Sequence, residues 1–226
     1  MSAPADIKAL ALDFDRTLTT EDLRPVPRAI GLIDAARARG LKVLVVSGRP
    51  MPWLERELGA HVDALVAENG CLWKLPDGPV RETRPRLMDV RLALEGLDME
   101  AEFGDVLASV DVAHHDRLAE HFRLRGHELD LIKNRDRVMI LPSGVDKAVG
   151  LLAALHALGV DPRHCAAAGD GENDVPLLRA VGHGIAVSNA VPELKEQADE
   201  VVPLPGGEGI AHWISTRWLP AQEASA

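Results

Sequence analysis

Long hydrophobic runs are missing from this sequence of 226 residues. The longest, such as residues 41–46, are far shorter than the roughly 20 apolar residues that a helix needs to cross a bilayer. The first ten residues contain no basic start, apolar block or cleavage site, so we expect no secretory signal. We therefore expect a cytoplasmic protein with no membrane-spanning segment.

Cysteine is scarce, and positive charge is in deficit. Cys71 and Cys165 are too few for a disulfide framework in a chain of this length, so we expect two small buried residues in a reducing compartment. The 25 basic residues are outnumbered by 35 acidic ones, which gives a net charge of −10. Because non-specific nucleic-acid binding draws on excess lysine and arginine, we expect no nucleic-acid partner.

Hydrophobic residues make up 46% of the chain, which is enough for a buried core. Short apolar segments alternate with segments of helical spacing. We predict strands at 7–12, 41–46, 64–68, 164–168, 184–187 and 200–202, helices at 27–39, 52–58, 145–158, 175–181, 192–198 and 210–218, a hairpin at 72–80 and a loose tail at 220–226. This alternation predicts an α/β fold, a Rossmann-like doubly wound parallel sheet with helices on both faces.

Residues 83–142 differ in texture from the rest of the chain. They are rich in charge and irregular in period, with a helix predicted around 87–97 and a strand at 138–141. We interpret them as a small α/β cap domain inserted into a catalytic core formed by residues 1–82 and 143–226. Its arginines could hold a second anionic group of a ligand, but acidic residues outnumber basic ones here, so we expect most of them in surface ion pairs.

Polar side chains follow the predicted strands at the points where the strands end. They are Asp13, Asp15, Ser47, Asp170 and Asp174, and Lys147 stands near a helix start. Ligands of doubly wound sheets bind beyond the carboxyl ends of the strands, so we expect these groups to converge. Clustered carboxylates repel one another, and a hard cation such as Mg²⁺ relieves that repulsion with oxygen ligands alone.

Four ordered motifs resemble those of the haloacid dehalogenase superfamily of phosphohydrolases. They are DFDRTLT at 13–19, VVSGR at 45–49, the lysine of GVDKAVG at 144–150, and GDGEND at 169–174. AENG at 67–70 and GIAVSNA at 184–190 resemble the branch with a large α/β cap between the second and third motifs. The likeness is greatest to phosphoglycolate phosphatases and sucrose-phosphate-type sugar phosphatases, and in the cap it is one of position only.

The resemblance implies roles for the four carboxylates. Asp13 is the nucleophile that forms an aspartyl-phosphate. Asp15 protonates the leaving alcohol and then activates water. Mg²⁺ is held by the Asp13 side chain, the Asp15 carbonyl and Asp170, with Asp174 acting near the metal through water or by positioning Lys147.

Further residues are implied to bind the substrate. Ser47 donates a hydrogen bond to a phosphoryl oxygen, and Lys147 offsets the charge of Asp13 and of the phosphate. The other candidates are Gly48, Arg49, Asn69, Asn173 and Asn189. Turn formation is the alternative explanation for Asn173 and Asn189.

One residue departs from the family pattern, because Arg16 stands where the family usually has glycine. Its side chain either extends into solvent, pairs with an acid such as Glu21, or biases the site toward an anionic substrate. If the turn requires a positive φ, Arg16 is strained.

We interpret the chain as a Mg²⁺-dependent phosphomonoesterase acting on a small phosphate ester such as phosphoglycolate or a sugar phosphate. One alternative is a phosphomutase or phosphotransferase on the same fold, in which an alcohol accepts the phosphoryl group instead of water. Another is a non-catalytic phosphoryl-binding module. The oligomeric state is left open.

Overall fold

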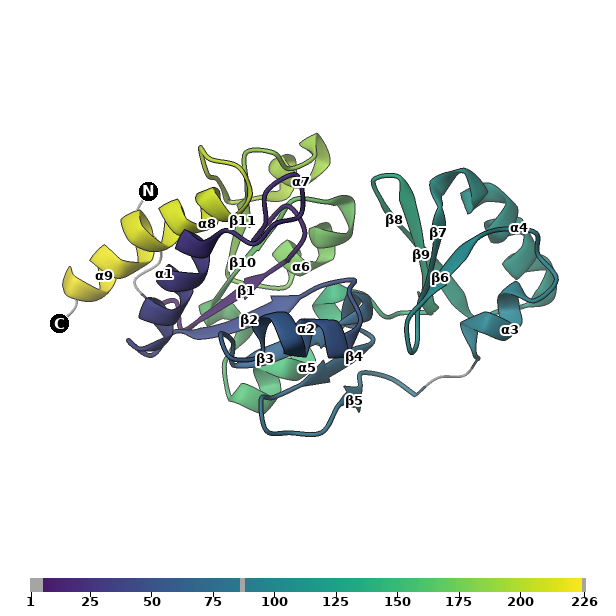
Figure 1. Cartoon of the computed structure of the whole chain (residues 1–226), viewed down its shortest axis with the longest axis horizontal. Coiled ribbons are helices and arrows are strands. Elements are labelled where there is room, and N and C mark those ends of the chain that lie inside the picture. Colours follow the sequence, from purple (N-terminus) through teal and green to yellow (C-terminus); the bar gives the residue numbers. More distant parts are fainter. Residues whose placement is uncertain (1–5, 86–87, 225–226) are drawn as a thin grey trace.

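The structure is a computed structural model and describes residues 6–85 and 88–224. The larger of its two sheets contains β1 (Ala9–Leu12), β2 (Lys42–Val46), β3 (Ala64–Ala67), β4 (Leu72–Lys74), β5 (Arg81–Glu82), β10 (Cys165–Gly169), β11 (His183–Ala186) and β12 (Glu200–Val201). The strand order is β12-β11-β10-β1-β2-β3-β4-β5. The strands from β12 to β3 are parallel, and β4 and β5 continue the sheet as the predicted antiparallel hairpin (Figure 1).

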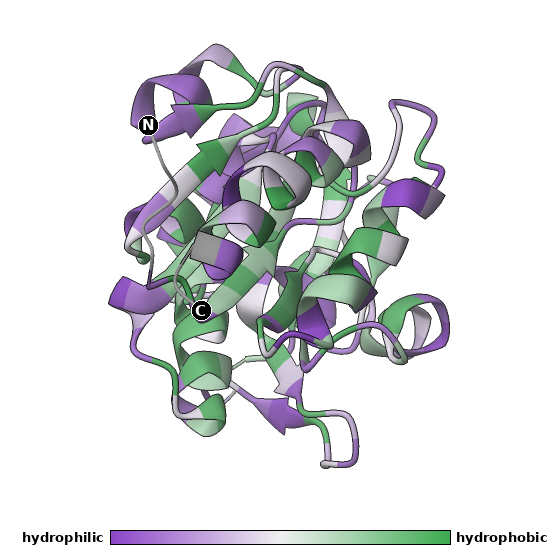
Figure 2. Ribbon diagram, turned by 90° about the vertical axis from the view of Figure 1, so that its left-hand side faces the viewer, coloured by the Kyte–Doolittle hydropathy of each residue, from purple (hydrophilic) through white to green (hydrophobic). Residues whose placement is uncertain are grey.

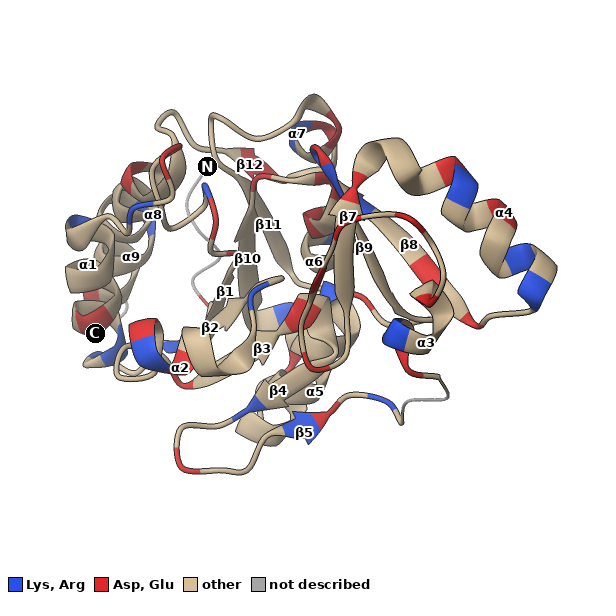
Figure 3. Cartoon of the chain, turned by 45° about the vertical axis from the view of Figure 1, so that its right-hand side comes forward, with Lys and Arg blue, Asp and Glu red and all other residues tan. Residues whose placement is uncertain are grey.

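Helices cover both faces of this sheet, which confirms the predicted α/β fold. They are α1 (Pro27–Arg37), α2 (Met51–Leu58), α5 (Lys147–Leu158), α6 (Val175–Arg179), α7 (Pro192–Gln197), α8 (Gly206–Trp213) and α9 (Leu219–Ala224). Figure 3 shows α1, α2 and α8 on one face and α5 and α6 on the other. None of the helices in the described ranges is long and apolar enough to span a membrane.

The central strands are buried from end to end, as expected for a parallel sheet with two covered faces. Figure 2 shows hydrophobic residues along these strands. Cys71 and Cys165 are buried in this core, as predicted, and neither forms a disulfide within the described residues. Burial raises the pKa of the Cys165 thiol to about 12, so this thiol is not ionised at neutral pH.

A second sheet lies beside the first and is antiparallel throughout. It comprises β6 (Ala101–Phe103), β7 (Ala108–Asp111), β8 (Leu129–Asn134) and β9 (Arg137–Pro142) in the order β6-β7-β9-β8. One face packs on α3 (Val90–Leu94) and α4 (His115–Arg125) through a separate hydrophobic cluster that includes Val110, Phe122 and Ile140. Because strand side chains alternate, Ser109, Arg137 and Met139 lie on the opposite face, toward the larger sheet. We call residues 88–142 the insert (Figure 1).

Two helical predictions need correction. The helix predicted around 87–97 is confined to α3, and Leu87 lies outside the described residues. The tail predicted as loose is helical as far as it is described, because α8 continues through a π-helical segment, Ile214–Trp218, into α9. Trp213 and Trp218 anchor it in the core, and Trp218 donates a hydrogen bond from Nε1 to the Ile7 carbonyl at 3.2 Å. Residues 225 and 226 lie outside the described chain.

Candidate active site

A cavity of about 510 Å³ separates the carboxyl edge of the larger sheet from the insert. The parallel register sets Leu12 beside Val45 and Ala168, so the residues that follow all three strands emerge together. The predicted site residues that line the cavity are Asp13, Asp15, Gly48, Arg49, Lys147, Asp170 and Asn173. Ser47, Asn69, Asp174 and Asn189 are not among the lining residues of the described chain.

Lys147 lies at the floor of the cavity between two carboxylates. Its Nζ donates to Asp13 Oδ1 and to Asp174 Oδ1, each at 2.6 Å, and the side chain is 2% exposed. Burial alone would lower the pKa of Lys147, but the charges of Asp13 and Asp174 outweigh it and raise the pKa. The ammonium therefore stays charged, and it offsets part of the negative charge of the site.

The position of Lys147 depends on a close approach of backbones. Lys147 begins α5, and the Asp146 carboxylate caps that helix by accepting from the Val149 N–H at 2.9 Å. Gly70 packs against this helix start, where a Cβ would meet the Asp146 carbonyl at 1.9 Å. With a φ of 97° as well, this position requires glycine.

Three carboxylates converge around the lysine. Oxygen atoms of Asp13, Asp170 and Asp174 lie within 4.8 Å of one another. Burial raises the pKa of Asp13 and of Asp170, and the charge of Asp174 raises both further. This cluster of oxygen donors fits a hard divalent cation, since such an ion would relieve the repulsion that raises these pKa values.

Both carboxylate oxygens of Asp174 accept hydrogen bonds from other groups of the protein. Its Oδ2 accepts from the Asp170 N–H at 2.9 Å and from the Gly171 N–H at 3.0 Å, while Oδ1 holds Lys147. This arrangement orients Lys147 and the loop that carries Asp170. It fits the positioning alternative for Asp174 better than direct metal coordination.

Asp15 lies at the cavity wall in a two-pronged ion pair with Arg49. Arg49 Nη2 is 2.6 Å from Asp15 Oδ1, and Nε is 3.0 Å from Oδ2. The Arg49 guanidinium also stacks over the Trp53 ring at 4.3 Å, with Phe14 on the same strand-end loop at 5.7 Å. These contacts fix the direction of the Asp15 carboxylate.

Arg16 adopts the conformation that the usual glycine would favour, with a φ of 61°. Its side chain pairs with Glu21 at 3.5 Å and also lines the cavity. Its backbone N–H donates to Thr19 Oγ1 at 2.7 Å, which closes the turn. Arg16 therefore pairs with Glu21 and faces the cavity at the same time.

The remaining predicted side chains lie beneath or beside the cavity. Ser47 is buried, and its Oγ accepts from the Arg49 N–H at 3.2 Å. Asn173 Nδ2 donates to Asn69 Oδ1 at 3.1 Å, so Asn69 is linked to the cavity through a residue that lines it.

Asn189 is bonded by backbone groups at both ends of its amide. It donates to the Arg16 carbonyl at 3.1 Å and accepts from the Gly206 N–H at 2.8 Å. These bonds tie the 13–19 loop to the start of α8. They fit the turn-forming alternative for Asn189, which is not among the residues of the described chain that line the cavity.

The insert supplies side chains that the sequence did not single out. The β8–β9 hairpin carries Asn134, Arg135, Asp136 and Arg137 into the cavity. Its two-residue turn holds Arg135 at a φ of 55° and contains no glycine, so the usual hairpin signal is absent.

Glu68 joins the core to the insert. It is fully buried just after β3, and its carboxylate accepts from the backbone N–H groups of Asp105, Val106 and Leu107 at 2.8, 2.8 and 2.9 Å. Its own N–H donates to the Arg49 carbonyl at 3.2 Å. Through its backbone and its side chain, Glu68 thus connects the 47–49 loop to the β6–β7 loop of the insert.

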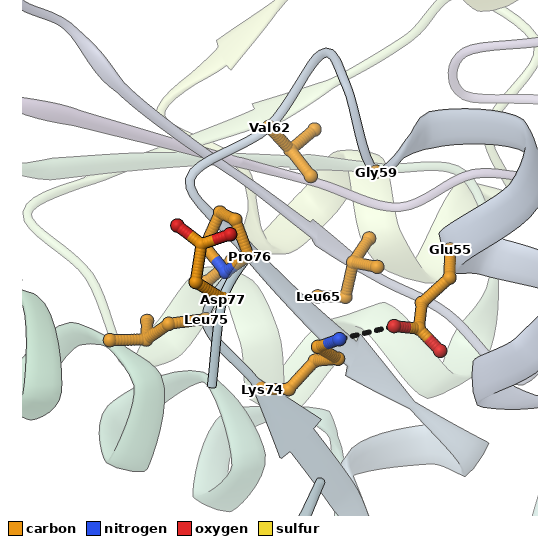
Figure 4. Close-up of a pocket in the computed structure, with 9 residues that line it drawn as sticks. Glu55, Gly59, Val62, Leu65, Lys74, Leu75, Pro76 and Asp77 are labelled. Carbon is orange, nitrogen blue, oxygen red and sulfur yellow. Dashed lines mark hydrogen bonds and ion pairs between the residues drawn. The ribbon is translucent and has the colours of Figure 1, made fainter. Parts of the chain in front are cut away.

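A smaller cavity of about 280 Å³ lies between α2 and β4 (Figure 4). Its wall combines the apolar Val62, Leu65 and Leu75 with the charged Glu55, Lys74 and Asp77, of which Glu55 and Lys74 pair with each other. It contains no cluster of potential metal ligands among the described residues. The chemistry is therefore concentrated in the larger cavity.

Known proteins resemble this chain in sequence and in fold. The family model for haloacid dehalogenase-like hydrolases matches residues 10–85 and 88–214. A phosphoglycolate phosphatase of Methanopyrus kandleri is 28% identical over 219 residues, which cover 89% of this chain and 93% of that protein. Phosphoglycolate phosphatase 2 of Saccharolobus solfataricus is 31% identical over 213 residues, covering 89% of this chain and 88% of the relative. A crystal structure from Thermoplasma acidophilum superposes with a TM-score of 0.79 at 21% identity and covers 92% of this chain and 97% of its own.

Proposed function

The chain belongs to the haloacid dehalogenase-like hydrolases and is a phosphatase, and we propose that it hydrolyses a small phosphate monoester through a covalent intermediate on Asp13. The observation that carries this proposal is the position of Asp13 at the floor of the cavity, 2.6 Å from the Lys147 ammonium and beside Asp15 at the wall. A nucleophile, a fixed positive charge and a second carboxyl group thus face one space.

In the first step an Asp13 oxygen attacks phosphorus while the ester P–O bond breaks. The leaving oxygen takes a proton from the Asp15 carboxyl group and departs as an alcohol. Lys147 remains charged beside Asp13 and stabilises the negative charge of the phosphoryl group.

In the second step Asp15 takes a proton from a water molecule, whose oxygen attacks phosphorus. The bond between Asp13 and phosphorus breaks, and inorganic phosphate leaves. Both aspartates return to their starting states, and the net reaction consumes one water molecule.

A magnesium ion fits the carboxylate cluster. Asp13, Asp170 and the backbone carbonyl of Asp15 would hold it, and Asp174 would position Lys147 and the Asp170 loop. When bound, the ion offsets the negative charge of the phosphate and of the carboxylates that now raise one another's pKa.

The segment 83–142, which contains the insert, would act as a cap that selects the substrate. A cavity of about 510 Å³ has room for a small organophosphate. Phosphoglycolate is the first candidate substrate. Relatives that are about 30% identical over most of the chain are named phosphoglycolate phosphatases. Enclosure by the β8–β9 hairpin would exclude bulk water from the reacting phosphate.

Replacement of Asp13 by asparagine tests the proposal. Asp13→Asn should lower phosphate release from phosphoglycolate on the order of 10³-fold or more, because the amide cannot attack phosphorus. Asp77→Asn, at an exposed turn residue outside the larger cavity, serves as the control and should keep full activity. Phosphate release that survives in a folded Asp13→Asn protein would refute the nucleophile assignment.

A further inference from the structure

Arg135 bridges the insert and the carboxylate cluster. It stands in the β8–β9 turn, and its Nη2 donates to Asp170 Oδ2. Its backbone N–H donates to Glu172 Oε2 at 3.1 Å, which ties the turn to the loop after β10. The Arg135 side chain is 29% exposed and the Asp170 side chain 6%, so the pair lies at the inner wall of the cavity.

The partner of Arg135 distinguishes it from the other arginines that line the cavity. Arg16 pairs with Glu21, and Arg49 pairs with Asp15. Arg137 donates to the Oγ and the carbonyl oxygen of Ser109, each at 2.9 Å, and pairs with Glu102 at 3.3 Å. Within the described part of the chain, Arg135 is the arginine that pairs with a member of the carboxylate cluster of Asp13, Asp170 and Asp174.

A divalent ion and the Arg135 guanidinium would compete for the same carboxylate. Asp170 Oδ2 faces Arg135, and Asp170 Oδ1 is 3.5 Å from the Thr17 hydroxyl. An ion drawn to Asp13 and Asp170 places positive charge beside the guanidinium and weakens its bond. The freed guanidinium would remain in the cavity because the turn is held at Glu172.

We propose that Arg135 recognises a second anionic group of the substrate, and that it becomes available for this by giving up Asp170 when the metal ion binds. This inference rests on the proposed function and names a residue that would bind the part of the substrate that leaves as the alcohol. The planar guanidinium suits a carboxylate, with which it forms two parallel hydrogen bonds. The substrate class is therefore a small phosphate ester that carries a carboxylate.

The proposed replacement of Arg135 by a metal ion at Asp170, called the exchange below, can be tested without substrate turnover. Calorimetric titration of Mg²⁺ into the metal-stripped protein compares the wild type with Arg135→Ala and with Arg123→Ala, an exposed α4 residue outside the larger cavity. Arg135→Ala should bind Mg²⁺ about threefold to tenfold more tightly, since the competing charge is gone, and Arg123→Ala should match the wild type. Unchanged or weaker Mg²⁺ binding by Arg135→Ala would overturn the exchange.

Recognition of the second anion is tested by a ratio of specificities. The value of kcat/KM is measured for phosphoglycolate and for ethyl phosphate, which lacks the carboxylate. In Arg135→Ala the ratio of the two values should fall at least about tenfold, because only phosphoglycolate offers a carboxylate to the guanidinium. Arg135→Lys keeps the charge but lacks the planar pair of donors, so its ratio should fall less.

The outcomes separate this inference from the proposed function. An unchanged ratio, or an equal loss for both esters in a folded variant, would overturn recognition by Arg135. Wild-type protein that releases phosphate from ethyl phosphate but not from phosphoglycolate would overturn it too, while leaving the phosphatase intact. Failure to release phosphate from any ester would refute the proposed function, and the Mg²⁺ titration would still decide the exchange at Asp170.

Discussion

At the scale of single residues, the site depends on charges that compensate one another in a buried place. Asp13, Asp170 and Asp174 would be costly together in a protein interior, and Lys147 makes the arrangement possible. Burial and the charge of Asp174 still raise the pKa of Asp13 and Asp170, so the lysine does not neutralise the cluster fully. The remaining negative charge is what a metal ion would meet.

Replacement of Arg16 by glycine should stabilise the fold. The φ of 61° is unfavourable for arginine and costs glycine nothing, whereas the loss of the exposed pair with Glu21 costs little. We expect Arg16→Gly to raise the free energy of unfolding by about 0.5 kcal/mol, as measured by urea denaturation. Arg24→Gly, at an exposed position without positive φ, should lower it. A less stable Arg16→Gly protein would show that the turn gains more from the side chain than it loses in strain.

Single residues also mark the limits of prediction from sequence. Asp13, Asp15, Lys147 and Asp170 were found because each follows or begins a regular element of a recognisable kind, and parallel strands bring such positions to one edge. For Asn189 the sequence left turn formation and substrate binding open, because a motif does not give the direction of an amide, and its bonds to Arg16 and Gly206 fit turn formation. Arg135 looked like any other arginine of the insert, since its contact with Asp170 spans 35 residues.

At the scale of elements, the attachment of the insert depends on loops rather than on regular structure. Glu68 connects the end of β3 to the loop before β7 through three backbone N–H groups. Its φ of 52° turns the chain so that the carboxylate reaches that loop. AENG resembles a branch of the family with a large cap, but a sequence does not show which backbone N–H groups a side chain will bind, so the partners of Glu68 could not be predicted.

Removal of the Glu68 carboxylate should loosen the insert. Glu68→Ala leaves three buried N–H groups without their acceptor, and we expect a loss of about 3 kcal/mol in the free energy of unfolding. Glu68→Gln retains an acceptor oxygen and should lose about half as much. Hydrogen exchange at the amides of residues 105–107 should accelerate in Glu68→Ala. Glu100→Ala, at an exposed position of the insert, provides the baseline, and equal stability of the two alanine variants would contradict the role of Glu68.

The elements themselves were predictable in the core and less so in the insert. Fully buried strands and helices that begin at Pro27 or end before Gly159 carry strong local signals. The β8–β9 turn has no glycine, and α3 has only five residues, so neither stands out. The C-terminal helix extends beyond its prediction because tertiary contacts of Trp213 and Trp218 override a weak local pattern.

At the scale of the whole molecule, the two sheets contribute different parts of the cavity wall. The larger sheet brings the polar side chains at its strand ends to one edge, and the smaller sheet lies beside that edge (Figure 3). Side chains of β7, β9 and the β8–β9 turn line the cavity between the two sheets. Each sheet has its own hydrophobic cluster, but Val106, Leu107 and Leu141 of the insert pack in the cluster of the larger sheet. The insert is therefore joined to the core by apolar packing as well as by Glu68.

The most direct test is to trap the phosphoryl group on the protein. Asp15→Asn is mixed with p-nitrophenyl phosphate, whose leaving group needs no proton, and quenched in acid. Because the amide cannot activate water, the intermediate should accumulate, and peptide mass spectrometry should find one phosphoryl group on Asp13. Release of phosphate with no phosphoryl group on the protein, or its appearance on another residue, would contradict the account.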